Sequence, residues 1–179
     1  MSIDDRILDA ALKVVQDVGL RAATTRRIAD EAGVNEVTLF RRFGSKDQLL
    51  TDALRRRQLV LELPLDPVDP ASELRTFVRA QAEHLTRVGP MIRSTLNEID
   101  AHPNLCAVAH EGPRKVAADL GKYLERLVVL GLAAPDLDLH AAVTMVMGSV
   151  FTEIVARPMM PADRRLAPDE VADRYVPLF

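Results

Sequence analysis

Residues 35–46, NEVTLFRRFGSK, carry side chains whose types suit the recognition of double-stranded nucleic acid. Glu36 could accept a hydrogen bond from cytosine N4, Val37 could pack on a thymine methyl group, and Arg41 could reach guanine or a phosphate. Lys46 stands at a predicted helix start, where backbone N–H groups add to its attraction for an anion. The side chains better suited to phosphates are Thr25, Arg26, Thr38, Arg42 and Lys46.

Metal binding and catalysis are the other chemistries to consider. The chain has histidines at positions 84, 102, 110 and 140 and one cysteine, Cys106. The histidines lack the paired spacing on a helix face that a metal clamp requires, and no Ser/His/Asp or cysteine nucleophile pattern can be identified. We therefore expect no enzyme activity, no metal and no cofactor. A single cysteine excludes an intrachain disulfide and suits a reducing cytoplasm.

Two short helices joined by a glycine turn must position the polar side chains of residues 24–46. The first helix should begin after Thr24 or Thr25, because a hydroxyl there can accept from the unpaired N–H groups of the first turn. Its buried stripe comprises Ile28, Ala29 and Ala32. Gly33 follows the last of these, where a left-handed backbone costs a glycine least.

The second helix should begin after Asn35, whose side chain can cap it. Leu39 and Phe43 point inward at a four-residue spacing, which leaves the charged and polar residues on the outer surface. Ser45 can then cap a long helix that runs from Lys46 into the low sixties. An earlier helix, residues 3–18, completes a three-helix group.

This segment resembles the N-terminal DNA-binding domain of TetR-family transcriptional repressors. The matching features are Ile28-Ala29, Ala32-Gly33-Val34, Thr38-Leu39-Phe40, Phe43, and Ser45-Lys46 ahead of Leu49 and Leu50. The match extends upstream through Ile7 to Gly19 and covers the first third of the chain; beyond residue 60 only the number and rhythm of helices agree. The resemblance implies that residues 35–43 enter the major groove.

Phe40 departs from the family pattern, which usually has a tyrosine whose hydroxyl contacts a DNA phosphate. Phenylalanine has no donor for that bond, and the loss of one phosphate contact weakens affinity without changing sequence preference. The predicted DNA-binding residues are Thr25, Arg26, Asn35, Glu36, Val37, Thr38, Phe40, Arg41, Arg42 and Lys46.

Composition fits a chain of one or two compact domains. The 179 residues are 48% hydrophobic, enough to bury a substantial core. Residues 1–60 hold 11 Lys and Arg against 9 Asp and Glu, whereas the remainder holds 12 against 17, so the basic excess lies on the motif half. The acidic, amphipathic N-terminus is unlike a signal peptide, and the apolar run 141–151 is too short to span a bilayer. We expect a soluble, cytoplasmic protein without a membrane partner.

Beyond residue 60 the sequence predicts helices only, which gives an all-α fold. Prolines 64, 67 and 70 deny a continuing helix its backbone donors, so we place a stiff connector and a domain boundary there. The expected domains are a helix-turn-helix domain, 1–62, and a helical effector-binding and dimerisation domain, 63–179. The expected helices after the connector are 71–88, 90–101, one from a loop at 102–104 to 130, 139–156, and a short one from Pro168 to about 177.

Gln81 falls on the apolar stripe of its helix and needs hydrogen-bond partners if buried. Its amide either bonds a neighbouring helix, which we favour, or presents a polar contact to a small ligand. The family resemblance implies an effector pocket in this half, although its chemistry cannot be assigned. The candidate wall residues are Phe77, Gln81, His84, Met91, Tyr123, Met147 and Phe151.

The helix 139–156 has two apolar faces, which is typical of a helix placed between a core and another partner. Family members pair through their last two long helices, and a two-fold dimer would place two reading helices on a palindromic site. An alternative is a fully enclosed core helix. The candidate dimer residues are Ala141, Met145, Gly148, Thr152, Val171 and Tyr175.

The leading hypothesis is a homodimeric, sequence-specific DNA-binding regulator, a repressor released from its operator by a small apolar or amphipathic effector. The residues do not distinguish a repressor from an activator. The alternative is a ligand-binding or protein-interaction module of the same fold that has weakened or lost DNA binding. Phe40 and the acidic residues Asp30, Glu31 and Glu36 favour that alternative, because they reduce the positive potential near a DNA groove.

Overall fold

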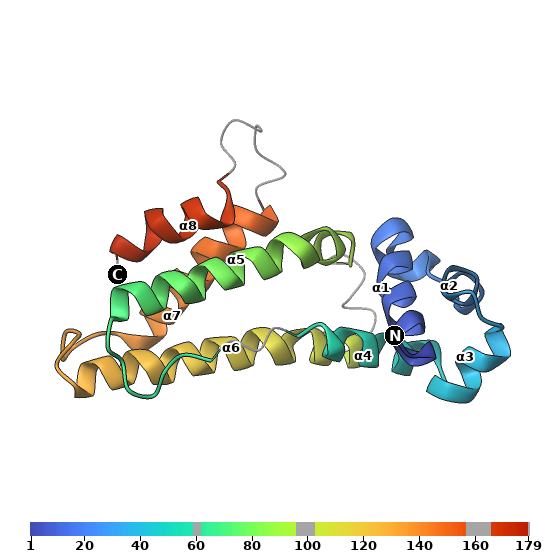
Figure 1. The fold of residues 1–179 in the computed structure, drawn as a ribbon, viewed down its shortest axis with the longest axis horizontal. Helices are drawn as coiled ribbons and strands as arrows, with labels where there is room; N and C mark the ends of the chain where they lie inside the picture. Colours follow the sequence, from blue (N-terminus) through green and yellow to red (C-terminus); the bar gives the residue numbers. More distant parts are fainter. Residues whose placement is uncertain (59–61, 96–102, 157–165, 179) are drawn as a thin grey trace. The chain divides into compact units, whose positions relative to one another are not determined.

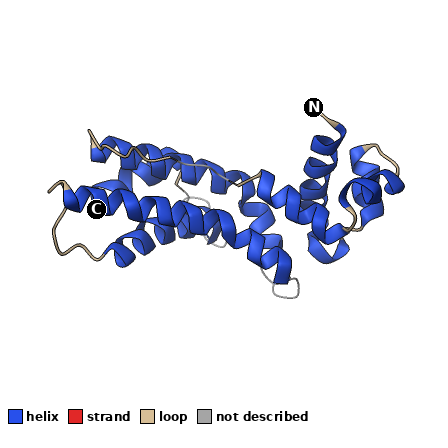
Figure 2. Cartoon of the chain, turned by 90° about the horizontal axis from the view of Figure 1, so that it is seen from below, coloured by secondary structure: helices blue, strands red, loops and turns tan. Residues whose placement is uncertain are grey.

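The computed structural model describes residues 1–58, 62–95, 103–156 and 166–178. These ranges contain eight α-helices and no strand (Figure 2), so the expected all-α class is confirmed. The chain forms two compact units, which we call unit 1 (residues 1–58 and 90–112) and unit 2 (residues 59–89 and 113–179). Residues 90–112 therefore group with unit 1, whereas the sequence-based division assigned them to the second domain.

Unit 1 is built on four consecutive helices around one apolar core (Figure 1). Helix α1 packs against both α2 and α4, and α3 packs against α2 and α4. The largest fully buried side chains of this core are Ile7, Ile28, Leu39, Leu49, Leu50 and Leu105. The four helices are α1 (Ile3–Ala22), α2 (Thr25–Ala32), α3 (Glu36–Phe43) and α4 (Lys46–Arg56).

Two helix ends in unit 1 differ from the sequence prediction. Gly19 interrupts α1 as expected, with φ 81°, but one more turn carries the helix to Ala22. Helix α4 was expected to reach the low sixties, and it ends at Arg56. The N–H of Arg57 donates to the carbonyl of Leu54 at 3.1 Å, a shortened bond pattern that tightens the last turn. Residues 59–61 lie outside the described ranges.

Unit 2 has its own apolar core and holds most of the remaining helices. Helix α8 lies along α5, where Arg75 pairs with Asp173 at 3.1 Å and Arg79 pairs with Asp169 at 2.6 Å. The bounds are α5 (Pro70–Thr95), α6 (Pro103–Val129), α7 (Leu139–Phe151) with a π-helical segment (Thr152–Ala156), and α8 (Pro168–Tyr175) with a 3-10 turn (Val176–Leu178). The buried residues that form the core include Phe77, Val78, Leu120, Tyr123, Val146, Val150 and Val171.

Two prolines lie inside helices, and the first of them corrects the predicted helix pattern. Pro90 was expected to open a new helix and instead lies within α5, and Pro113 lies within α6. Residue 103 begins α6 rather than a loop, while the predicted helix end at 101 and His102 lie outside the described ranges. Each internal proline follows a glycine. Helical geometry before a proline is disfavoured partly by the Cβ of the preceding residue, and glycine has none.

The same two dipeptides mark where the chain changes unit. Helix α5 passes from unit 2 to unit 1 between Gly89 and Pro90, and α6 passes back between Gly112 and Pro113. A Cβ built on Gly112 would lie 3.1 Å from the Cγ of Gln58, which follows the end of α4, so this close approach also favours glycine at position 112.

The proline-rich connector is fastened to unit 2 by polar contacts. The Glu73 carboxylate accepts hydrogen bonds from the backbone N–H of Val68 at 2.9 Å and from the Tyr123 hydroxyl at 2.5 Å. The bond from Tyr123 holds the pKa of Glu73 below its usual value, and burial raises the pKa of Tyr123. Asp66 pairs with Arg126 at 3.3 Å. These contacts support the stiff connector inferred from the prolines.

Helix α7 and the π-helical segment form an apolar stretch whose surface is largely uncovered. Leu139–Ala156, a longer stretch than the run 141–151, is long and apolar enough to cross a membrane by length and composition alone, a test that core helices of soluble proteins also pass. Only 22% of these residues are buried. Val146 and Val150 face the core, whereas Met145 is 59% exposed. The two apolar faces predicted from the sequence are therefore present, and the alternative of a fully enclosed core helix is wrong for the single chain.

Candidate nucleic-acid interface

Local capping interactions set the start of each helix in the motif. The hydroxyl of Thr24 accepts from the N–H of Arg27 at 3.3 Å, and the side-chain carbonyl of Asn35 accepts from the N–H of Val37 at 2.9 Å. Gly33 ends α2 with φ 65° and ψ 40°, the left-handed geometry that glycine adopts at least cost. The Ser45 hydroxyl accepts from the N–H of Gln48 at 3.1 Å and begins α4. All four predicted turn and cap positions are confirmed.

The orientation of α3 follows from the burial of one side chain. Leu39 is fully buried, and Phe43 packs half-buried against the same core. Because side chains on a helix advance by about 100° per residue, the opposite face must point outward. It does: Val37 is 71% exposed and Phe40 is 46% exposed. Arg41 is exposed on the same helix.

Glu36 and Thr25 are bonded to each other across the starts of α3 and α2. The Thr25 hydroxyl donates to the Glu36 carboxylate, and both side chains are half-buried. Glu36 was predicted to accept from cytosine, and Thr25 was predicted to contact a phosphate. In the structure the two side chains are hydrogen-bonded to each other instead, and this bond joins the start of α2 to the start of α3.

Two of the predicted phosphate contacts are also engaged within unit 1. Arg42 Nη1 lies 2.6 Å from Oδ1 of Asp4, in the first turn of α1. Lys46 Nζ donates to the backbone carbonyl of Leu20 at 2.8 Å. Asp4 and Leu20 were not identified from the sequence, and no spacing rule links positions so far apart.

Arg26 and Arg41 are the exposed cations of the motif that keep their guanidinium groups available. In the described part of the chain neither forms an ion pair, and they extend from α2 and α3 respectively. Thr38 is half-buried and Phe40 carries no hydrogen-bonding group. The outward surface that α3 and the start of α2 present is therefore Arg26, Val37, Phe40 and Arg41. We call these four residues the reading surface.

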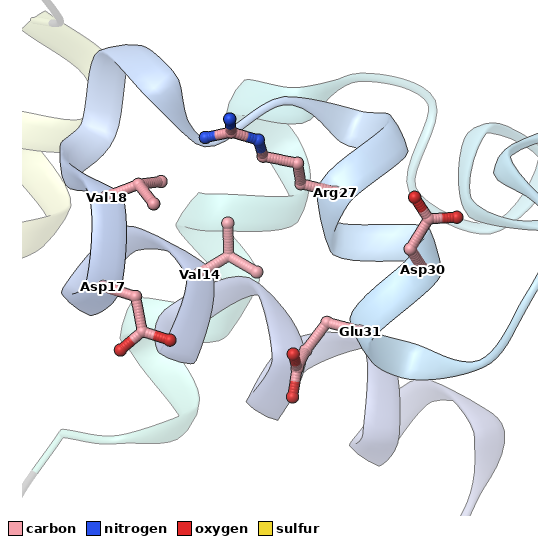
Figure 3. A pocket seen from close by; sticks show the side chains of 6 residues that line it. All are labelled: Val14, Asp17, Val18, Arg27, Asp30 and Glu31. Carbon is pink, nitrogen blue, oxygen red and sulfur yellow. The ribbon is translucent and has the colours of Figure 1, made fainter.

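A shallow depression of about 410 Å³ lies between α1 and α2 (Figure 3). Arg27 donates to the carbonyl of Ala22 at 3.2 Å, and Lys13 lies 2.9 Å from Glu31. The hydrogen bond to Glu31 raises the pKa of Lys13. Lys13 also pairs with Asp17 at 3.4 Å, so three of the four charged lining residues have partners outside the lining. None of the predicted effector or DNA-binding residues contributes to the depression. The residues lining it are Val14, Asp17, Val18, Arg27, Asp30 and Glu31.

The predicted effector residues do not all lie together. Phe77, Gln81 and Tyr123 are buried in unit 2, and His84 and Met147 are half-buried there. Met91 instead packs into the core of unit 1, and Phe151 is exposed, so neither belongs with the buried group. The structure thus groups neither residue with the other five, and the effector site stays a prediction.

Gln81 is the most unusual side chain of this group. It is 6% exposed, and its Oε1 is buried without a hydrogen-bond partner in the described ranges. The favoured interpretation, in which the amide bonds a neighbouring helix, does not account for this oxygen.

The predicted dimer residues divide into exposed and enclosed positions. Met145, Gly148 and Thr152 are exposed along α7 and its continuation, and Ala141 is half-buried. Val171 is fully buried within its own subunit, which removes it from any interface. Tyr175 donates its hydroxyl to Glu153, so it also packs within unit 2.

Comparison with known proteins places these features in a family. Residues 7–53 match the tetR family of bacterial regulatory proteins. The transcriptional regulator YvkB of Bacillus subtilis is 49% identical over 45 residues, which are 25% of this chain and 24% of YvkB. The transcriptional repressor KstR2 of Mycolicibacterium smegmatis is 28% identical over 144 residues, which are 75% of this chain and 69% of KstR2. The match to YvkB thus spans only a quarter of that protein.

The fold extends this likeness beyond the motif. The crystal structure of the transcriptional regulator FadR from Bacillus subtilis, in complex with stearoyl-CoA, superposes with a TM-score of 0.76 and 16% identity. The superposition covers 97% of this chain and 96% of FadR, and at this identity it speaks for the fold alone. The motif match, the relatives and the shared fold agree: the chain belongs to the TetR family of bacterial transcriptional regulators.

Proposed function

We propose that the protein is a sequence-specific DNA-binding regulator that represses transcription by binding a palindromic operator as a homodimer. The observation that carries this proposal is the reading surface: Val37, Phe40 and Arg41 point outward from α3, which the buried Leu39 fixes, and Arg26 adds a guanidinium from the start of α2. Exposed guanidinium and apolar groups on one helix face are the groups that read base edges in the major groove. The name of KstR2 supports a repressor rather than an activator.

The competing proposal is a module of the same fold that no longer binds DNA. The pairing of Arg42 with Asp4 favours it, because one expected phosphate contact is already occupied. Against it, the acidic residues near α3 are themselves engaged: Glu36 bonds Thr25, and Glu31 pairs with Lys13. Lys13 compensates the charge of Glu31 in part, the Thr25 hydroxyl occupies an oxygen of Glu36, and the two unpaired arginines of the reading surface remain. We therefore favour DNA binding.

A second copy of the chain is the occupant we assign to the exposed face of α7. Met145, Gly148 and Thr152 form an uncovered stripe with small residues that allow close helix approach. A membrane would fit the apolar stretch less well, because buried Glu153 and its partner Tyr175 hold that end of the segment against α8. A two-fold pair would also supply the second reading surface that a palindromic operator requires.

We propose that a small apolar or amphipathic effector, bound in unit 2, releases the protein from DNA. Its helical core is apolar, and the unpartnered Oε1 of Gln81 offers one buried hydrogen-bond acceptor. A ligand that carries an N–H or O–H donor would satisfy that oxygen. The stearoyl-CoA bound by FadR is an amphipathic molecule with such donors, which supports this class. An effector that binds preferentially to the conformation unable to hold DNA would lower operator affinity.

Selection from a random duplex pool is expected to recover an inverted repeat. Two reading surfaces related by a two-fold axis bind two half-sites of opposite orientation, separated by about one helical turn. Affinity for the recovered duplex should fall steeply between about 50 and 200 mM salt, because bound phosphates release counterions. Recovery of no enriched sequence, together with a flat salt dependence, would remove the DNA-binding proposal and leave the competing module.

Replacement of Arg26 by alanine should weaken binding to operator and unrelated duplex alike. An unpaired guanidinium at the start of α2 is assigned to a phosphate, so its loss should reduce the slope of log affinity against log salt by about 0.9. Fluorescence anisotropy with labelled duplexes measures both quantities. Arg27→Ala is the matched control, because Arg27 bonds Ala22 and lines the depression between α1 and α2. Equal losses in both variants would contradict the assigned surface.

Met145→Glu should convert the dimer to monomers. A carboxylate in a buried apolar interface costs several kcal/mol when unpaired, by order of magnitude, and sedimentation velocity reports the change in mass. Val68→Glu provides the control, since Val68 is equally apolar and 90% exposed but lies on the connector. A dimer that persists in Met145→Glu would exclude this face of α7 as the interface.

Gln81→Leu should stabilise the free protein and abolish its response to an amphipathic effector. Removal of an unsatisfied buried acceptor is expected to raise the free energy of unfolding by roughly 1 kcal/mol or more, measured by urea denaturation. Gln58→Leu should do the opposite, because the Gln58 amide donates to the carbonyl of Val108 at 3.4 Å. Stearoyl-CoA is the probe: it should raise the melting temperature of the wild type and not of Gln81→Leu. A rise of equal size in both would remove Gln81 from the effector site.

A further inference from the structure

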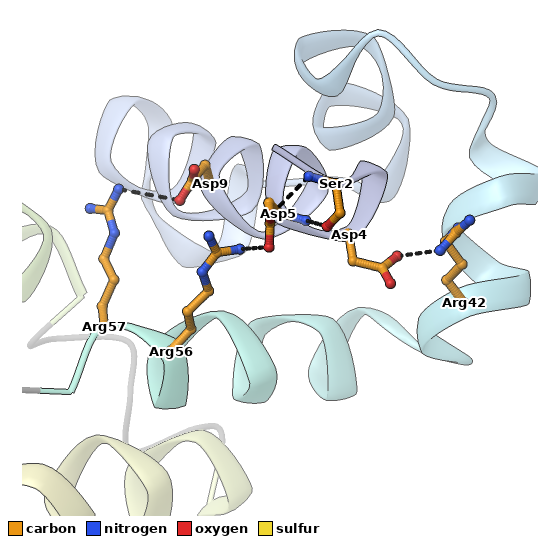
Figure 4. Close-up of polar contacts among 7 residues, drawn as sticks. All are labelled: Ser2, Asp4, Asp5, Asp9, Arg42, Arg56 and Arg57. Atoms are coloured by element: carbon orange, nitrogen blue, oxygen red, sulfur yellow. Dashed lines mark hydrogen bonds and ion pairs between the residues drawn. The ribbon is translucent and has the colours of Figure 1, made fainter.

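Three aspartates on one side of α1 each face an arginine from a later part of unit 1 (Figure 4). We call Asp4, Asp5 and Asp9 the α1 carboxylate row. Their partners come from the end of α3 and the end of α4, and all six side chains are between one-third and one-half exposed. The pairs are Asp4 with Arg42 at 2.6 Å, Asp5 with Arg56 at 2.6 Å, and Asp9 with Arg57 at 3.8 Å.

The three carboxylates differ in the interactions that they form. Asp5 belongs to the cap of α1: it accepts from the N–H of Ser2 at 2.8 Å, and its own N–H donates to the Ser2 hydroxyl at 3.1 Å. Hydrogen bonds between Ser2 and the Asp5 carboxylate, the one from the Ser2 backbone N–H first, lower the pKa of Asp5 more than Arg56 does. Asp9 touches Arg57 only loosely. Asp4 takes no part in the cap hydrogen bonds, and its carboxylate accepts a hydrogen bond from Arg42.

Arg42 is the one arginine of these pairs that lies on the helix carrying the reading surface. It lies one residue after Arg41, in the last turn of α3. Its contact with Asp4 runs through a single nitrogen, Nη1, and the Arg42 side chain is 36% exposed. A guanidinium binds carboxylate and phosphate oxygens through the same donors. A DNA phosphate that approaches Arg42 therefore meets a carboxylate already bound to it.

We propose that Asp4 competes with DNA phosphates for Arg42 and thereby limits the affinity of the protein for duplex DNA of any sequence. The proposal rests on the DNA-binding function proposed above. Contact of Arg42 with phosphate requires the ion pair to break, and it leaves the charge of Asp4 close to the bound strand. Since phosphate contacts carry no sequence information directly, Asp4 affects all duplexes alike. It is a positioning residue that acts through Arg42.

Asp4→Asn tests the competition directly. The amide keeps the size of the side chain but removes the charge that holds Arg42. Affinity should rise about two- to fivefold for both the selected operator and an unrelated duplex of the same length, the range that corresponds to losing an exposed ion pair. The dependence of log affinity on log salt should become steeper by about 0.9, because one more phosphate is neutralised. Anisotropy titrations between about 50 and 200 mM salt give both values.

A double-mutant cycle distinguishes competition for Arg42 from a general change in charge. When Arg42 is replaced by glutamine, Asp4→Asn should raise affinity by no more than the general effect of removing one charge, which Asp9→Asn measures. Asp9→Asn, which removes the same charge from the same side of α1, should raise affinity less than Asp4→Asn does. Circular dichroism on heating checks that all variants remain folded.

Two results would overturn the inference while the wild type still binds DNA with a steep salt dependence. One is an unchanged or reduced affinity in Asp4→Asn, which would show that the pair holds Arg42 for binding or that Arg42 does not contact DNA. The other is an equal gain in affinity in the Arg42→Gln background, which would indicate a general electrostatic effect. If the wild type binds no duplex at any salt concentration, the proposed function fails together with this inference.

Discussion

The burial of Leu39 is the contact on which the reading surface depends. Helix α3 has only eight residues, too short to be stable in water without tertiary packing. Leu39 anchors it in a core that also contains Ile7, Ile28 and Leu49. Once that side chain is fixed inward, the helical repeat places Val37, Phe40 and Arg41 outward. The orientation of the helix therefore follows from the desolvation of one leucine, and the polar contacts adjust what that surface offers.

Several polar groups around the motif are satisfied inside unit 1, so the proposed DNA binding would exchange these internal partners for phosphates and bases. Thr25 and Glu36 hold each other, Lys46 is bonded to the carbonyl of Leu20, and Arg42 is paired with Asp4. Each internal bond rigidifies the surface, and each must be weighed against the contact with DNA that replaces it. A surface that is ordered before binding loses less side-chain entropy on association. The same internal partners reduce the binding free energy that each phosphate contact contributes, because an internal bond must break first.

Local rules account for the part of the fold that the sequence predicted. Thr24, Asn35, Ser45 and Gly33 act within four residues of their own positions, and helical spacing identified Leu39 and the two faces of α7. The pairing of Arg42 with Asp4 joins residues 38 positions apart, and no periodicity encodes it. Pro90 misled because a rule for single residues ignored the preceding glycine. Val171 was assigned to the dimer interface, but it is buried within its own subunit. An apolar stripe on a short helix does not reveal whether it faces the core of its own chain or a partner.

The position of the two Gly–Pro dipeptides bears on how an event in unit 2 could reach unit 1. The chain changes unit at Gly89–Pro90 and at Gly112–Pro113, within continuous helices. A proline removes one backbone hydrogen bond and crowds the carbonyl four residues earlier, and glycine adds backbone freedom. Bending therefore costs least at these two points, while the helix on either side stays stiff. A change in unit 2 that turned the ends of α5 and α6 would carry Met91 and Leu105 with it, and both side chains belong to the core that holds Leu39.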